Sequence, residues 1–130
     1  MAIYRIFSPV RQTARMDDGI VGIVDWSRVR ALHAEIGTAD FREVVDLFLE
    51  EVDETVARLR AHDAASLAAD LHFLKGSALS LGFVEFAGLC AAGERHAESG
   101  AAAAPDLPAV RAAWTRGKDR FLTGLADQAF

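Results

Sequence analysis

Cysteine is almost absent from this sequence, because Cys90 is the only one among 130 residues. An internal disulfide cannot form, and a reducing cytoplasm is the expected setting. Long apolar runs are also missing. No stretch reaches the roughly 18 consecutive apolar residues that a membrane-spanning helix needs, and the apolar run near the N-terminus is too short for a secretory signal. These absences predict a cytoplasmic chain with no membrane segment.

Positive charge is scarce as well. The chain has 14 Lys and Arg residues against 19 Asp and Glu residues, which gives a net charge of −5. This balance argues against nucleic acid and against anionic membrane surfaces as partners. A nucleotide-binding P-loop is also missing, since Gly19 and Gly22 are not followed by the Lys-Ser/Thr pair. We therefore expect no ATP site of its own and interpret this glycine segment as a linker.

No part of the sequence shows the strict alternation of apolar and polar residues that is typical of a strand. Apolar residues instead recur at three- and four-residue spacing, and the length corresponds to one domain. We predict an all-α fold, an antiparallel four-helix bundle with an additional short N-terminal helix. Residues 1–24 form an N-terminal extension in this interpretation, and residues 25–130 form the bundle. The expected helices cover about 26–36, 39–61, 64–81, 83–98 and 108–125.

Five residues mark the expected helix ends. Asp25, Thr38 and Asp63 have side chains that commonly cap a helix N-terminus. Gly37 and Gly82 stand where helices should stop, and Gly82 should adopt the left-handed conformation that glycine tolerates. The helix that follows Asp63 is the one of chemical interest.

His72 is expected on the outer face of that helix. At roughly 100° per residue, five apolar residues of the segment 64–81 fall within about 40° of a common centre, and His72 lies about 140° from that centre. Ala68, Lys75, Gly76 and Leu79 share its face. The expected buried stripe consists of Leu67, Leu71, Leu74, Ala78 and Leu81.

The neighbours of His72 give this face a chemical character. Lys75, three residues on, places an ammonium beside the imidazole and favours an anion such as a phosphoryl group there. Gly76 costs a helix interior roughly 1 kcal/mol relative to alanine, which is understandable if something bulky must approach the ring. Leu79 adds an apolar contact. Ala68 has a small side chain and leaves the other side of the imidazole unobstructed. A histidine on a helix surface is nevertheless most often a solvated side chain with no special role.

The run His72-Phe73-Leu74-Lys75-Gly76-Ser77-Ala78-Leu79-Ser80-Leu81-Gly82, followed by Leu89-Cys90-Ala91-Ala92-Gly93-Glu94, resembles the motif of histidine-containing phosphotransfer (HPt) domains. The resemblance covers roughly residues 23–100. The family usually has a larger apolar residue where this chain has Gly93, which we expect to loosen the helix packing there.

The resemblance implies a phosphorelay intermediate. His72 would accept a phosphoryl group from the phospho-aspartate of one receiver domain and pass it to the aspartate of another. Lys75 would stabilise the phosphoryl oxygens, and Gly76 would clear space for the receiver. Ala68, Ala69 and Leu79 would contact the partner. The implied partners are response-regulator receiver domains and a hybrid histidine kinase.

The chain would then be a phosphoryl carrier rather than an enzyme. It would have no cofactor of its own, because the Mg²⁺ ion would belong to the receiver, which completes the transfer chemistry.

The sequence is also compatible with other functions. A helical module could bind a receiver or a kinase and inhibit or scaffold it without carrying phosphate. A metal site formed by His72, His96 and Glu94 lacks the Glu-x-x-His spacing of di-metal bundles, so we expect no metal. A hydrolase that pairs His72 with Ser77 is disfavoured because these residues lie on opposite sides of the helix. The remaining histidines are interpreted as surface or helix-end residues: His33, His62 and His96.

Overall fold

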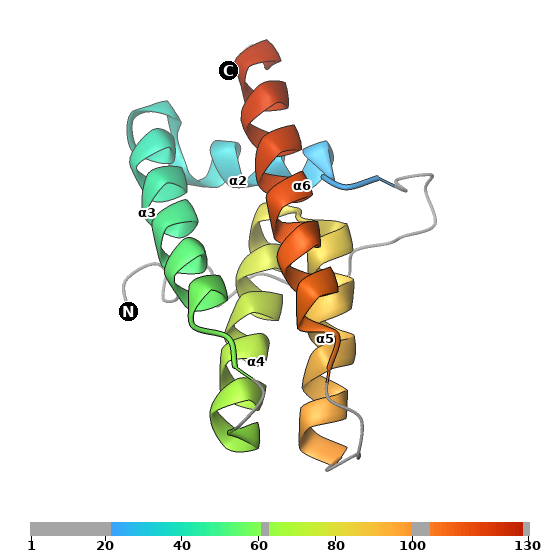
Figure 1. The fold of residues 1–130 in the computed structure, drawn as a ribbon. Helices are drawn as coiled ribbons and strands as arrows, with labels where there is room; N and C mark the ends of the chain where they lie inside the picture. Colours follow the sequence, from blue (N-terminus) through green and yellow to red (C-terminus); the bar gives the residue numbers. More distant parts are fainter. Residues whose placement is uncertain (1–21, 61–62, 100–104, 129–130) are drawn as a thin grey trace.

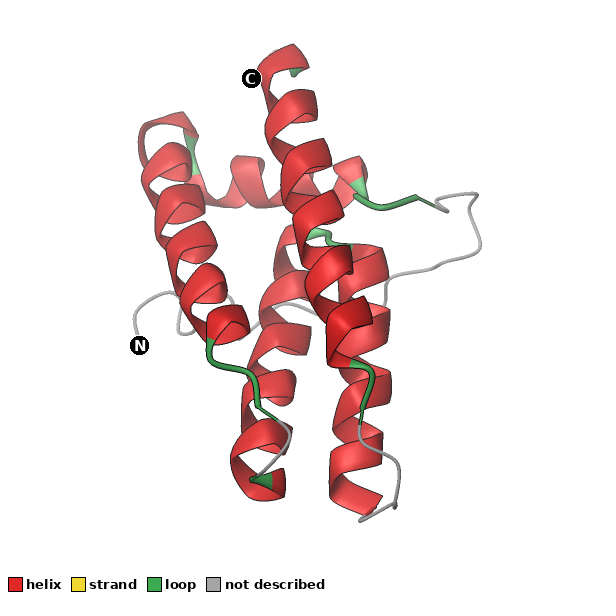
Figure 2. Cartoon of the chain, in the orientation of Figure 1, coloured by secondary structure: helices red, strands yellow, loops and turns green. Residues whose placement is uncertain are grey.

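The computed structural model describes residues 22–60, 63–99 and 105–128. These residues contain no named strand, and the all-α prediction is confirmed (Figure 2). None of the described helices is both long and apolar enough to cross a membrane. The predicted extension, residues 1–24, lies almost wholly outside the described residues, so its boundary stays a prediction. The helices, labelled as in Figure 1, are α2 (Trp26–Ile36), α3 (Thr38–Ala57), α4 (Ala64–Leu81), α5 (Val84–Ser99) and α6 (Leu107–Asp127).

Helices α3 to α6 form an antiparallel bundle in which consecutive helices run in opposite directions (Figure 1). Helix α2 lies across one end of this bundle, beside the start of α3 and the turn between α4 and α5. Helices α4 and α5 form the most extensive helix pair of the bundle. The predicted four-helix bundle with an additional short N-terminal helix is therefore confirmed.

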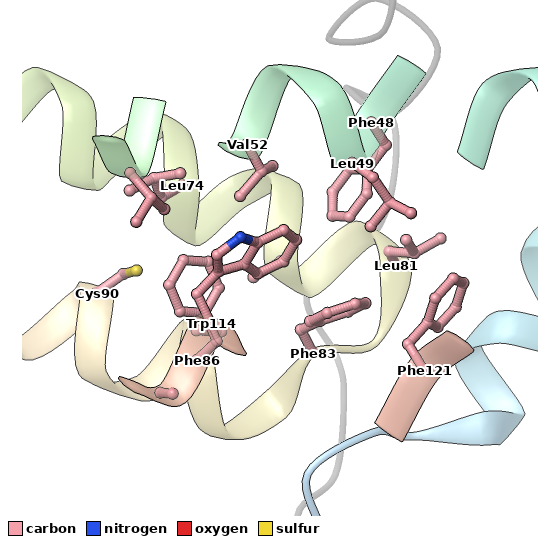
Figure 3. Close-up of a cluster of buried hydrophobic side chains, with 14 of the residues drawn as sticks. Phe48, Leu49, Val52, Leu74, Leu81, Phe83, Phe86, Cys90, Trp114 and Phe121 are labelled. Carbon is pink, nitrogen blue, oxygen red and sulfur yellow. The ribbon is translucent and has the colours of Figure 1, made fainter. Parts of the chain in front are cut away.

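Aromatic side chains fill the centre of the bundle. Phe83 is fully buried and lies between Trp114 and Phe121, with ring centroids 5.3 Å and 5.2 Å away (Figure 3). Phe48 of α3 and Phe86 of α5 complete the cluster, at 5.7 Å from Phe83 and 5.2 Å from Trp114. Offset and tilted rings at these separations add roughly 0.5–1.5 kcal/mol per pair beyond their burial. This cluster joins α3, α5 and α6 into one core.

Most of the predicted helix ends are confirmed. The Asp25 carboxylate accepts hydrogen bonds from the backbone N–H groups of Ser27 and Arg28, at 3.1 Å and 3.4 Å, and Asp63 caps α4 through Ser66 at 3.3 Å. Gly82 ends α4 with φ of 91°.

The prediction for Thr38 is wrong. Gly37, with φ of 96°, is the N-cap of α3, and Thr38 is its first helical residue. The Thr38 hydroxyl instead lies 3.2 Å from His33 Nε2. The reason is that a single glycine links α2 to α3, which leaves no room for a separate capping residue. Helix α3 also ends earlier than expected, at Ala57, although Leu59 beyond it is still buried.

The start of α2 holds the turn between α4 and α5. The Asp25 backbone N–H donates to the Gly82 carbonyl at 2.7 Å, and Val84 N–H donates to the Ile23 carbonyl at 3.2 Å. Arg28 Nε donates to the Ser80 carbonyl at 2.8 Å, so a cation faces the negative end of the α4 dipole. These contacts fix the register of α4 and α5 along their axes. This register sets the position of the candidate site.

Two helical glycines should respond oppositely to alanine. A Cβ at Gly117 would lie 2.8 Å from Phe83 Cδ2, and this ring is fully buried and cannot move away. Gly88 is exposed, and a Cβ there would meet no atom within 4 Å. We expect Gly117→Ala to lower the free energy of unfolding by about 1–2 kcal/mol, because overpacking outweighs the gain in helix propensity. Gly88→Ala should raise it by up to about 1 kcal/mol. Urea unfolding measures both, and equal effects would contradict this account of Gly117.

Candidate functional site

His72 lies on the outer face of α4, as the periodicity predicts. Its side chain is 63% exposed, whereas all five residues of the predicted stripe are buried. Ser77 is buried at 6% exposure, so the two side chains lie on different faces and the His72–Ser77 hydrolase pair is not formed. The imidazole is thus presented to a partner rather than packed in the core.

Glu94 of α5 holds both His72 and Lys75. Its Oε2 lies 2.9 Å from His72 Nδ1, and its Oε1 lies 3.1 Å from Lys75 Nζ. One carboxylate therefore binds the imidazole with one oxygen and the ammonium with the other. The Glu94 side chain is only 11% exposed, so this bridge is largely shielded from water.

Gly93 makes this contact possible. A Cβ at this position would lie 3.1 Å from Leu71 Cδ1, so a larger residue would require the Leu71 side chain to give way at this close contact between α4 and α5. The expectation that Gly93 loosens the packing is therefore wrong. The glycine allows the two helices to approach closely, and Glu94, the next residue, reaches His72.

The pKa of Glu94 is lowered. Burial acts in the opposite direction and raises it, but hydrogen bonds from Lys75 and His72, together with their charges, outweigh burial. Glu94 is therefore a carboxylate at neutral pH and can only accept hydrogen bonds. It follows that His72 Nδ1 carries the proton and donates it to Glu94. In the neutral ring this leaves the lone pair on Nε2 free.

The side chains around His72 are mostly small, and some of them are apolar. A Cβ at Gly76 would meet no atom within 4 Å, so the fold does not require glycine at this position. Ala69 is exposed, Ala68 is half-buried, and Leu79 is half-buried against the core. The structure thus places Ala68, Gly76 and Leu79 on the helix face predicted for them. Lys75 lies there too, but its ammonium is turned to Glu94.

The remaining titratable candidates lie elsewhere. His33 packs its ring edge against Phe41, with centroids 4.9 Å apart, and His96 is exposed in the last turn of α5. His62 lies outside the described residues. Within residues 22–60, 63–99 and 105–128, no group of three or more His, Cys, Asp or Glu side chains is arranged to hold a metal ion.

Cys90 is a core residue, as predicted. It is fully buried on α5, and burial, with a smaller contribution from the charge of Glu94, raises its pKa to about 12. The thiol therefore stays protonated at neutral pH and takes no part in chemistry at the site.

The sequence placed Glu94 in the family motif and in a disfavoured metal site, but it did not predict that Glu94 binds both His72 and Lys75. The sequence did contain a signal for a buried Glu94. This residue directly follows Gly93 and lies eight residues after Phe86 and four after Cys90, which places it on the buried side of its helix. A carboxylate on such a face needs a partner. The pattern does not tell which partner, since His72 is 22 residues away in the sequence.

Comparison with known families gives one clear result. The family model described as Hpt domain matches residues 43–122, which is more than half of the chain and includes most of α3 and α6 and the whole of α4 and α5. Neither the curated proteins nor the solved structures include a significant match.

Proposed function

The chain belongs to the Hpt domain family, and we propose that it carries a phosphoryl group on His72 between receiver domains of a phosphorelay. The donor would be the phospho-aspartate of one receiver, such as that of a hybrid histidine kinase, and the acceptor the aspartate of a second receiver. The observation that carries this proposal is the bond of 2.9 Å between His72 Nδ1 and Glu94, on an imidazole that is otherwise exposed. A cytoplasmic location is part of the same proposal.

The transfer step follows from the tautomer of His72. The Nε2 lone pair attacks the phosphorus atom of the phospho-aspartate, and the bond between phosphorus and the carboxylate oxygen breaks. The electron pair of that bond stays on the aspartate. Nδ1 keeps its proton, so the product ring is a phospho-imidazolium whose positive charge faces Glu94. Transfer to the second receiver is the same step in reverse, and no atom is gained or lost.

Lys75 and Gly76 support the approach of the phosphoryl group. Lys75 Nζ lies one turn from the ring and can neutralise phosphoryl oxygens after leaving Glu94, because its long side chain is flexible. Gly76 leaves open space beside His72, which admits the active site of a receiver. Since phosphoryl transfer is mostly positioning and charge neutralisation, the Mg²⁺ ion and the acidic residues can come from the receiver.

The alternative is a module that binds a receiver without carrying phosphate. Such a module needs shape and charge at its surface but no defined imidazole tautomer. The shielded Glu94 carboxylate, held by His72 and Lys75 together, favours the carrier.

The test is phosphoryl transfer from a receiver domain that has been phosphorylated with labelled acetyl phosphate and freed of excess reagent. We expect one label per chain that is stable in alkali and lost in acid, as a phospho-imidazole requires. Label that survives acid would indicate a phosphate ester instead. Binding of the receiver with no transfer of label would favour the alternative.

A further inference from the structure

An open pocket of about 360 Å³ lies at the corner where α3 ends and α4 begins. Its polar lining comes from Arg58 and Arg60 after α3, and from Asp63, Ser66 and Asp70 at the start of α4. Leu67 and Ala69 complete the wall on the side of α4. The pocket therefore combines two guanidinium groups with two carboxylates, and the pairing among them decides what it can bind.

Three of these four charges are engaged. Arg58 pairs with Asp70 at 3.1 Å, and Asp63 caps α4 by accepting from the Ser66 backbone at 3.3 Å and from the Ser66 hydroxyl at 3.0 Å. Arg60 differs from them. Among the described residues, no carboxylate lies within ion-pair distance of it.

The Arg60 guanidinium is nevertheless held in place. Its Nη1 donates to the carbonyls of Ala57 and Leu59, at 3.1 Å and 2.8 Å. Within the described part of the chain, Nε and Nη2 have no hydrogen-bond partner. A guanidinium oriented in this way by the backbone presents its remaining donors to a carboxylate with little loss of side-chain entropy.

The pocket borders the face that carries His72. Ala69, in the pocket wall, is three residues before His72, and side chains at this spacing on a helix are about 5–6 Å apart at Cβ. A protein partner of ordinary size covers about 800 Å². A receiver docked with its aspartate at His72 Nε2 therefore extends over Ala69 to the rim of the pocket.

The charge of the surrounding surface selects the chemistry of the occupant. The exposed face of α3 is acidic, and the whole chain carries a net charge of −5, so an acidic partner is repelled along α3. At the corner formed by Arg60, such a partner meets a cation that has no carboxylate partner in the described part of the chain. The exposed acidic residues of α3 are Asp40, Glu43, Asp46, Glu50 and Glu54.

We infer that the Arg60 pocket is an accessory docking subsite that receives an acidic side chain of the receiver domain while the receiver exchanges phosphoryl with His72. This inference rests on the proposed function and adds a second point of contact to it. The subsite contributes to binding and on-rate, not to the chemical step, because neither His72 nor Lys75 is among the residues that line it.

The experiment compares Arg60→Ala with Arg30→Ala. Arg30 is exposed on α2, at the other end of the bundle, and has no ion pair among the described residues, so both variants change the net charge equally. The probe is a purified receiver domain, used in titration calorimetry and in the transfer assay. We expect Arg60→Ala to weaken receiver binding about five- to tenfold and to leave the transfer rate at saturating receiver unchanged. Arg30→Ala should change binding less than twofold.

Two further variants sharpen the test. Arg60→Lys keeps the charge but loses the planar fork, and should fall between wild type and Arg60→Ala. Asp70→Asn releases Arg58 from its partner and should tighten binding two- to threefold. Circular dichroism confirms that each variant folds.

The outcomes separate the two proposals. Equal weakening by Arg60→Ala and Arg30→Ala, or a loss of maximal rate with unchanged binding, would overturn the docking subsite. Binding that depends on Arg60 but leads to no transfer by the wild-type chain would overturn the carrier function and leave the subsite standing. Absence of both binding and transfer would overturn both.

Discussion

His72→Gln is expected to carry no acid-labile phosphoryl label under conditions in which the wild-type chain is fully labelled. The glutamine side chain is of similar length, but its amide nitrogen lone pair is delocalised and cannot attack phosphorus. His72 is 63% exposed, so the substitution should change the free energy of unfolding by only about 0.5 kcal/mol. The loss of label would therefore be a chemical effect and not a failure to fold.

The matched control is His96→Gln. His96 is exposed on α5, as His72 is on α4, and it has no contact with Glu94 among the described residues. We expect its label to equal that of wild type, measured by alkali-stable counts per chain. Label retained on His72→Gln, or lost on His96→Gln, would contradict the assignment of His72 as the acceptor.

Glu94→Ala is expected to slow phosphorylation of His72 roughly 100-fold, which is the loss that a small misplacement of a reacting group can cause. Without the carboxylate, the Nδ1 proton loses the acceptor that fixes its position, so both tautomers are populated and the ring is no longer held in one orientation. The positive charge of the phospho-imidazolium also loses its counterion. Lys75 loses its anchor at the same time.

Two variants show whether Glu94 acts through its charge and position. Glu94→Gln keeps an oxygen that can accept from Nδ1 and should be slowed less than Glu94→Ala. Glu98→Ala, an exposed residue one turn further on α5, should react at the wild-type rate. Rates are measured at saturating receiver, so that binding does not enter. A rate for Glu94→Ala within twofold of wild type would sink this role.

The pH dependence of stability gives a second readout of Glu94. Its pKa is lower in the folded chain than the ordinary value of 4.5, so the carboxylate stabilises the folded state at pH values above 4.5. This contribution disappears as the pH falls through the lower folded pKa, because the protonated group no longer attracts Lys75 and His72. Urea unfolding should therefore show wild type to be more stable than Glu94→Gln at neutral pH, with the difference shrinking on acidification below about 4.5.

The helices themselves could be predicted because the information for them is local. Apolar residues three and four positions apart define the buried stripe of α4, and the capping side chains of Asp25 and Asp63 act on backbone groups two or three residues away. Gly82 ends α4 for a reason that also lies in one residue, its positive φ. The outward placement of His72 follows from the same periodicity. The wrong prediction of Thr38 as an N-cap shows the limit of such local information, since the neighbouring glycine is the N-cap of α3.

The contacts that make His72 chemically distinct depend on how α4 and α5 are aligned. Glu94 reaches His72 across 22 residues because Gly93 lets the helices approach and because the Asp25–Gly82 bond fixes the turn between them. Arg60, which has no ion-pair partner among the described residues, likewise comes to lie beside Ala69 where α3 and α4 meet. Periodicity within one helix assigns a residue to a face, but it contains no information on the register between two helices. Packing sets that register, and with it the partner of the imidazole.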